Sequence, residues 1–199
     1  PVDQGLIDQV MHIGNGSEPQ GLDPHVVTGV PEHHLLITMC EGLTISNPEG
    51  GANLPGMAES WEISEDGKTY IFNIRKDAKW SNGDNFVADD MVWSWMRVLT
   101  PSLGSQYPDM LYYVEGAEDF NTGVITDFSE VGVKAIDDKT LEVKLNNPTP
   151  FFLGLLSHYS TWPVHKETVL EFGEIDDRQG LWTSCLLYTS PSPRDPSIS

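Results

Sequence analysis

Residues 58–75 read AESWEISEDGKTYIFNIR, and this stretch decides the class of fold. Apolar and polar residues alternate on both sides of the dipeptide Asp66-Gly67. An Asp-Gly pair between two alternating runs predicts a β-hairpin, because glycine adopts the backbone conformation that a tight turn requires. The apolar positions of the two expected strands are Trp61, Ile63, Tyr70, Phe72 and Ile74.

A second hairpin is expected over residues 133–145, with its turn at residues 137–139. Between the two hairpins, an apolar stripe at helical spacing predicts a helix that Pro101 ends. This stripe comprises Met91, Val92, Trp95, Val98 and Leu99. Asp89 or Asp90 in the first turn would suit the positive end of the helix dipole. Hairpins interspersed with helices indicate an α+β or mixed α/β fold.

The flanking regions extend this pattern. We expect a strand over residues 6–14, a loop over 17–30 and a helix that begins near Pro31. Short helices are expected over 108–120 and 151–156. The apolar face of the helix after Pro31 would consist of Leu35, Leu36, Met39, Cys40 and Leu43, which makes Cys40 a buried, unreactive thiol.

The charge of the chain excludes several classes of partner. The 199 residues contain 11 Lys and Arg against 30 Asp and Glu, a formal charge of −19. Nucleic acid is excluded because its binding requires cations that neutralise phosphates, and anionic lipid is excluded for the same reason. No apolar run is long enough to span a bilayer. The two cysteines, Cys40 and Cys185, are too few for a disulfide scaffold and have no metal-ligand spacing. A single bridge between them is the alternative in an oxidising compartment.

Candidate catalytic and metal residues have simpler explanations. His33 and His34 are adjacent, so on a helix they diverge by about 100° and do not share an ion easily, and His25 alone adds little. The acidic pairs Asp89-Asp90, Asp137-Asp138 and Asp176-Asp177 are expected by chance among so many carboxylates. No nucleophile elbow, phosphate-binding loop or paired-cysteine motif occurs. We therefore predict a protein that is not an enzyme and has no cofactor or metal.

Residues 185–199, CLLYTSPSPRDPSIS, differ in composition from the rest of the chain. The first eleven resemble the translation of a transposase sequencing adapter. We therefore expect residues 185–199 to be a non-native tail and the remaining chain to be a fragment. A disordered, Pro- and Ser-rich tail is the alternative.

Several loop motifs occur in a characteristic order. They are Glu18-Pro19-x-x-Leu22-Asp23-Pro24, Gly56-Met57-Ala58-Glu59-Ser60-Trp61, Ala78-Lys79-Trp80-Ser81-Asn82-Gly83, Gly132-Val133-Lys134-Ala135-Ile136-Asp137-Asp138 and Asn147-Pro148-Thr149-Pro150-Phe151. From about Asn15 to Trp182 the chain resembles the family 5 extracellular solute-binding proteins of ABC importers. The family fold has two lobes that close on the ligand and an extra domain packed on one lobe.

The resemblance implies a division of this chain. Residues 1–42 would begin the first ligand-binding lobe, 43–162 would form an extra α+β domain, and 163–184 would return to the first lobe. The second lobe would be missing.

The resemblance also implies a function and a partial site. The protein would capture oligopeptides outside the cytoplasmic membrane, in the periplasm or attached to lipid, and deliver them as a monomer to the importer's permease subunits. Thr28, Gly29 and Val30 would pair with the peptide backbone, and Tyr107 would contact the peptide. Dipeptides, nickel or oligosaccharides are alternative ligands within the family. A secreted hydrolase with paired carboxylates is the alternative from another class.

Overall fold

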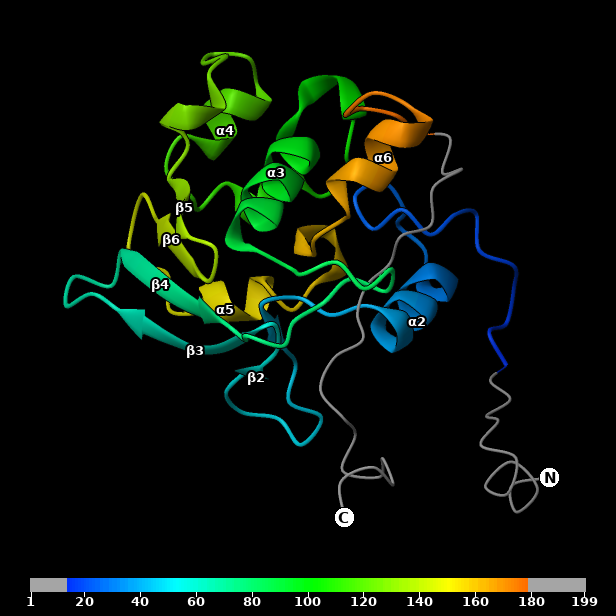
Figure 1. Cartoon of the computed structure of the whole chain (residues 1–199), viewed down its shortest axis with the longest axis horizontal. Coiled ribbons are helices and arrows are strands. Elements are labelled where there is room, and N and C mark those ends of the chain that lie inside the picture. The colour runs from blue at the N-terminus through cyan, green and yellow to red at the C-terminus, as the bar shows by residue number, and fades with distance from the viewer. Residues whose placement is uncertain (1–13, 179–199) are drawn as a thin grey trace.

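The computed structural model describes residues 14–178 (Figure 1). The strand expected over residues 6–14 lies outside the described residues, apart from Gly14. Within the described part, helices and strands mix in the order that the sequence predicts, and the α+β class is confirmed. No helix of this part has both the length and the apolar character needed to cross a bilayer.

A four-stranded antiparallel sheet forms one side of the fold (Figure 1). Its strand order is β3-β4-β6-β5, so the two hairpins lie side by side and pair through β4 and β6. Both predicted hairpins are thereby confirmed. The strands are β3 (Ala58–Ile63), β4 (Thr69–Ile74), β5 (Val133–Asp137) and β6 (Thr140–Lys144).

The register of β4 and β6 explains the alternation in the sequence. Phe72 lies opposite Leu141, and Tyr70 lies opposite Val143. All four side chains are buried in the main hydrophobic core. The intervening residues, which are polar except for Ile71, point to the other face and are less buried. Ile63, at the end of the edge strand β3, is 48% exposed, so the alternation overstated its burial.

Helix α3 (Ala88–Leu99) packs against strands β5 and β6 and closes the core. Four of the five predicted stripe residues are buried, namely Met91, Trp95, Val98 and Leu99, and Val92 is partly buried. At the start of α3, the Asp90 carboxylate accepts the backbone N–H of Val87 and the Trp80 indole N–H, at 2.9 and 3.0 Å. Burial raises the pKa of Asp90.

The connection between α3 and β5 differs from the expected single helix over 108–120. It contains η1 (Pro101–Leu103), η2 (Pro108–Leu111), α4 (Ala117–Asn121) and η3 (Phe128–Glu130). Gly116, with φ of 71°, separates η2 from α4. This left-handed conformation interrupts helical geometry and suits glycine, which has no Cβ.

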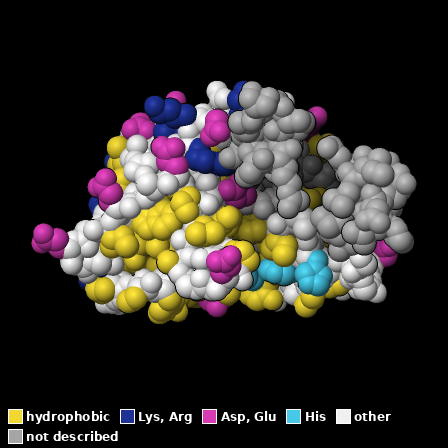
Figure 2. All heavy atoms as spheres, turned by 90° about the horizontal axis from the view of Figure 1, so that it is seen from below, with side chains coloured by type: hydrophobic (Ala, Val, Ile, Leu, Met, Phe, Trp, Pro, Cys, Tyr) yellow, Lys and Arg dark blue, Asp and Glu magenta, His cyan; other side chains and the backbone are white. Residues whose placement is uncertain are grey.

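Helix α2 (Val30–Met39) begins within one residue of the predicted start. Of its predicted apolar face, Leu36 is buried against Tyr159 and Trp162, and Leu43, which lies beyond the end of α2, is buried in the main core. Met39 is 41% exposed and Ile37 is 47% exposed. The spacing did not identify the buried side because α2 is apolar on several sides. Figure 2 shows hydrophobic side chains gathered at the surface on the underside of the molecule.

Cys40 ends α2 and is disulfide-bonded, so the expectation of a buried free thiol is wrong. The sequence pattern around a cysteine on the apolar side of a helix is the same whether its thiol is free or disulfide-bonded. The other cysteine of the chain, Cys185, lies outside the described residues.

The remaining elements are short. They are β1 (Thr44–Ile45), which pairs with β2 (Leu54–Pro55), then α5 (Phe152–Leu155), η4 (Tyr159–Thr161) and α6 (Lys166–Phe172). Helix α5 confirms the short helix expected over 151–156. The proposed domain boundaries near residues 42 and 162 stay a prediction.

Candidate functional site

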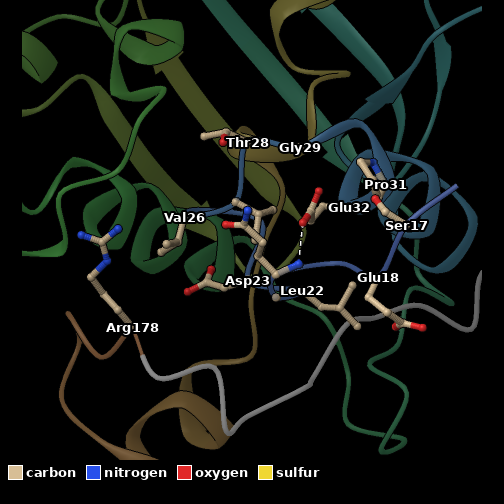
Figure 3. A pocket seen from close by; sticks show the side chains of 13 residues that line it. Ser17, Glu18, Leu22, Asp23, Val26, Thr28, Gly29, Pro31, Glu32 and Arg178 are labelled. Carbon is tan, nitrogen blue, oxygen red and sulfur yellow. Dashed lines mark hydrogen bonds between the residues drawn. The ribbon is translucent and has the colours of Figure 1, made fainter. Parts of the chain in front are cut away.

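A cavity of about 460 Å³ lies beside the loop that precedes α2 (Figure 3). The loop supplies most of its wall, and the start of α2 and Arg178 supply the rest. The lining residues are Ser17, Glu18, Gln20, Gly21, Leu22, Asp23, Val26, Val27, Thr28, Gly29, Pro31, Glu32 and Arg178.

Segment 28–30 has an open backbone. Thr28 and Gly29 line the cavity, whereas Val30 lies beyond its lining and is 66% exposed. Gly29 has extended dihedral angles, φ −86° and ψ 156°. Among the described residues, no hydrogen bond uses the N–H or C=O of Thr28 or the N–H groups of Gly29 and Val30. Val30 is the first residue of α2, and the Gly29 carbonyl accepts the N–H of His33 at 3.0 Å. The free N–H groups of Thr28, Gly29 and Val30 and the free C=O of Thr28 could pair with an extended ligand backbone.

Glu32 supports segment 28–30 from the first turn of α2. One carboxylate oxygen accepts the backbone N–H of Gln20 at 2.6 Å, shown by the dashed line in Figure 3. The other oxygen is buried without a partner in the described residues. A Cβ at Gly29 would overlap this carboxylate, so a larger residue there would displace the Glu32 side chain from its bond with Gln20.

The turn before the segment is fixed by a buried ion pair. Arg97 of α3 donates two hydrogen bonds to the Asp23 carboxylate, at 3.0 and 2.8 Å. The side chains of Arg97 and Asp23 are 0% and 5% exposed. The backbone carbonyl of Asp23 in turn accepts the N–H groups of Val26 and Val27, both at 3.1 Å. The ion pair therefore holds the turn that leads into Thr28.

His25 completes this network as a neutral imidazole. Its Nε2 lies 2.8 Å from the carbonyl oxygen of Trp162, and its Nδ1 lies 3.0 Å from an Arg97 nitrogen. Because Arg97 has only donors, Nδ1 must accept, and Nε2 therefore carries the proton and donates to Trp162. Burial, and then the Arg97 charge, lower the pKa of His25 to about 4.

Tyr107 lies near the segment through Tyr159. The Tyr159 hydroxyl donates to the carbonyl of Val27 at 3.2 Å. The ring of Tyr107 packs edge-on against Tyr159 and His158, with centroids 6.3 and 5.2 Å away. Burial, assisted by Tyr107, raises the pKa of Tyr159 to about 12. Tyr107 is partly buried and does not line the cavity, so segment 28–30 and Tyr107 are linked through one intervening side chain.

The histidine cluster considered from the sequence does not assemble. Both ring nitrogens of His25 have partners, and the rings of His33 and His34 are 6.1 Å apart. Within residues 14–178, no three His, Cys, Asp or Glu side chains form a group that could hold a metal ion.

Two of the acidic residues in the adjacent pairs have local structural roles. Asp90 is bonded at the start of α3. The Asp137 carboxylate accepts the N–H of Lys139 at 2.8 Å, and this bond lowers the pKa of Asp137.

Sequence reasoning missed Arg97 and Glu32. Arg97 directly precedes two residues of the predicted apolar stripe, and a charged residue beside such a stripe is a signal for a buried ion pair. Glu32 follows Pro31 in a first helical turn, where an acidic residue is expected at the surface. Its burial could not be anticipated, because it depends on Gln20 in the preceding loop.

Known proteins are similar to this chain over most of its length. Residues 54–183 match the model of the bacterial extracellular solute-binding proteins, family 5. The periplasmic oligopeptide-binding protein OppA of Escherichia coli (strain K12) is 45% identical over 168 residues, which are 83% of this chain and 30% of that protein. The oligopeptide-binding protein OppA of Bacillus subtilis (strain 168) is 42% identical over 157 residues, 79% of this chain and 28% of that protein.

Solved structures give the same relationship. Haemophilus influenzae OppA in complex with the peptide RPPGFSPFR has a TM-score of 0.76 and 42% identity, covering 81% of this chain and 31% of that chain. The murein tripeptide-binding protein MppA, in an unliganded open form, has a TM-score of 0.73 and 33% identity, covering 78% of this chain and 30% of that chain.

The chain spans about 30% of the length of the curated relatives it matches. The family model covers well over half of the 199 residues, and the fold agrees with its solved members. The chain therefore belongs to the bacterial extracellular solute-binding proteins, family 5.

Proposed function

We propose that the protein containing this chain captures oligopeptides outside the cytoplasmic membrane and delivers them to the permease of an ABC importer. One observation carries the proposal, namely the free backbone N–H groups of segment 28–30 beside the cavity. Every peptide has the same N–H and C=O groups, so pairing with this segment would bind peptides of many sequences. Relatives named as oligopeptide-binding proteins support the choice of ligand.

The binding mechanism would use two lobes. The described residues offer one wall, and a second lobe from the remainder of the protein would close over the peptide. Closure requires contacts that only the closed form makes, because a ligand shifts an equilibrium only by its differential affinity for the two states. Tyr107 would contact the peptide at the edge of segment 28–30.

The same proposal specifies the protein's wider behaviour. It would act in the periplasm or an equivalent extracytoplasmic location, as a monomer and without catalysis. Family members are solute-binding proteins, which supports a non-catalytic role. His33 and His34 do not support nickel binding. Their ring planes are inclined at 53° to each other, and their ring centroids lie 6.1 Å apart.

The test compares the 199-residue chain with the product of the gene read past codon 184. Calorimetry would measure binding of di-, tri- and pentapeptide pools, with nickel and an oligosaccharide as alternative ligands. We expect peptide binding by the longer product and only weak binding by the 199-residue chain. Sub-micromolar peptide binding by the short chain would contradict the two-lobe mechanism. If the longer product binds none of the peptide pools, the peptide proposal is wrong. If it hydrolyses the peptides, the protein is instead a hydrolase.

A further inference from the structure

The guanidinium of Arg97 uses all of its hydrogen-bond donors. It is fully buried, and each of its five N–H groups has an acceptor. The acceptors are the two Asp23 carboxylate oxygens, His25 Nδ1, the Ile175 carbonyl at 2.9 Å and the Asp177 carbonyl at 2.8 Å. A single side chain of α3 thus joins the turn at 23–25 to the chain at 175–177.

Both connected stretches lead directly into the cavity wall. The turn at 23–25 continues through Val26 and Val27 to Thr28, and the stretch at 175–177 continues to Arg178. His25 extends the connection to a third stretch through the Trp162 carbonyl. The cavity therefore lies between chain segments that meet at Arg97.

We propose that Arg97 is a positioning residue for ligand binding, through which helix α3 holds segment 28–30 in place at the start of α2. The inference rests on the proposed function, because it assigns the segment to ligand binding. Arg97 does not line the cavity, and it acts on segment 28–30 through Asp23 and His25.

Lysine cannot replace Arg97 in this role. Its ammonium has three donors at one point, whereas the acceptors around Arg97 are spread along a planar fork. Arg97→Lys keeps the positive charge beside Asp23 but leaves at least two acceptors without a donor. We expect the fold to remain and the turn at 23–25 to loosen.

The direct test measures the order of segment 28–30 in the ligand-free 199-residue chain. Backbone ¹⁵N relaxation should give order parameters of about 0.85 for Thr28, Gly29 and Val30 in the wild type, and below about 0.6 in Arg97→Lys. Arg75→Lys is the matched control, because Arg75 pairs with Glu41 away from the cavity. Unchanged order parameters in a folded Arg97→Lys variant would overturn the inference.

A second measurement covers the case in which Arg97→Lys does not fold. The charged groups that face the His25 ring are Arg97 and Asp23. If His25 Nδ1 were protonated, its N–H would face the Arg97 N–H donor, and the hydrogen bond between His25 and Arg97 would be lost. At pH 4 about half of the His25 rings would be protonated, so segment 28–30 of the wild type should be more mobile at pH 4 than at pH 7. His25→Gln keeps an acceptor and a donor but does not titrate, so it should not respond. An equally rigid wild-type segment at both pH values would overturn the inference.

Peptide affinity separates this inference from the proposed function. In the product of the longer gene, Arg97→Lys should weaken peptide binding at least tenfold, and Arg75→Lys should not. If the wild type binds peptide and Arg97→Lys binds equally well, the positioning role is wrong and the function stands. If the wild type binds no peptide but Arg97→Lys still loosens segment 28–30, the positioning role stands and the function is wrong.

Discussion

Replacing His25 with glutamine should change how the stability of the chain depends on pH. The pKa of His25 falls from 6.5 in the unfolded chain to about 4 in the folded one, chiefly through burial. Above pH 6.5 both states are neutral and the stability is complete. As the pH falls below 6.5, His25 of the unfolded chain binds a proton, whereas His25 of the folded chain stays largely neutral until about pH 4. The free energy of unfolding therefore decreases between pH 6.5 and pH 4. At 1.36 kcal/mol for each pKa unit, the loss approaches about 3 kcal/mol.

The assay is urea unfolding followed by tryptophan fluorescence, at several pH values between 7.5 and 4.5. The wild type should lose about 2–3 kcal/mol more of its free energy of unfolding than His25→Gln over this range. The difference between the two proteins matters, because burial also lowers the pKa of His158 and gives both a common slope. Parallel curves for the two proteins would refute the assignment of His25 as a buried neutral imidazole.

Four further changes test other parts of the structure. Gly29→Ala should lower the free energy of unfolding by about 1–3 kcal/mol, because a Cβ overlaps the Glu32 carboxylate; an unchanged urea midpoint would contradict this. Phe72→Ala removes a fully buried ring and should lower that free energy by about 3–5 kcal/mol in the same assay. Tyr107→Phe should weaken peptide binding by about 0.5–1.5 kcal/mol in calorimetry, with little change in the ligand-free Tm; equal affinity would remove Tyr107 from the site. Removal of residues 185–199 should leave the Tm unchanged under reducing conditions, and a clear drop would show that the tail is part of the fold.

The hairpins and helix α3 could be predicted because their patterns are local. Each strand of the sheet alternates, and the register that pairs Phe72 with Leu141 buries the apolar face that the alternation marks. Helix α3 presents a single stripe to that face. In such elements, the residues that determine burial lie within a few positions of one another.

The parts that could not be predicted depend on distant contacts. Helix α2 is apolar on several sides, and only its packing against Tyr159 and Trp162 selects Leu36 for burial. Glu32 and Arg97 are charged residues whose burial depends on acceptors or donors up to 80 positions away. The periodicity of the sequence contains no information about such distant pairs. Segment 28–30 was predicted only from the resemblance of the loop motifs to a known family.

An open binding segment has a physical problem that these distant contacts solve. The N–H groups of segment 28–30 make no backbone hydrogen bonds that would hold the segment in place. Fixing the backbone of each residue in one conformation costs about 1–2 kcal/mol in lost conformational entropy. If a peptide had to order the segment on binding, that entropy would be subtracted from its affinity. Instead, Tyr159 holds the carbonyl of Val27 on one side, and Glu32 lies under Gly29 on the other. Since neither contact uses the free N–H groups of the segment, its order is compatible with keeping those groups available to a ligand. The buried polar residues around the cavity thus offer a way to hold the loop in place while its N–H groups stay unpaired.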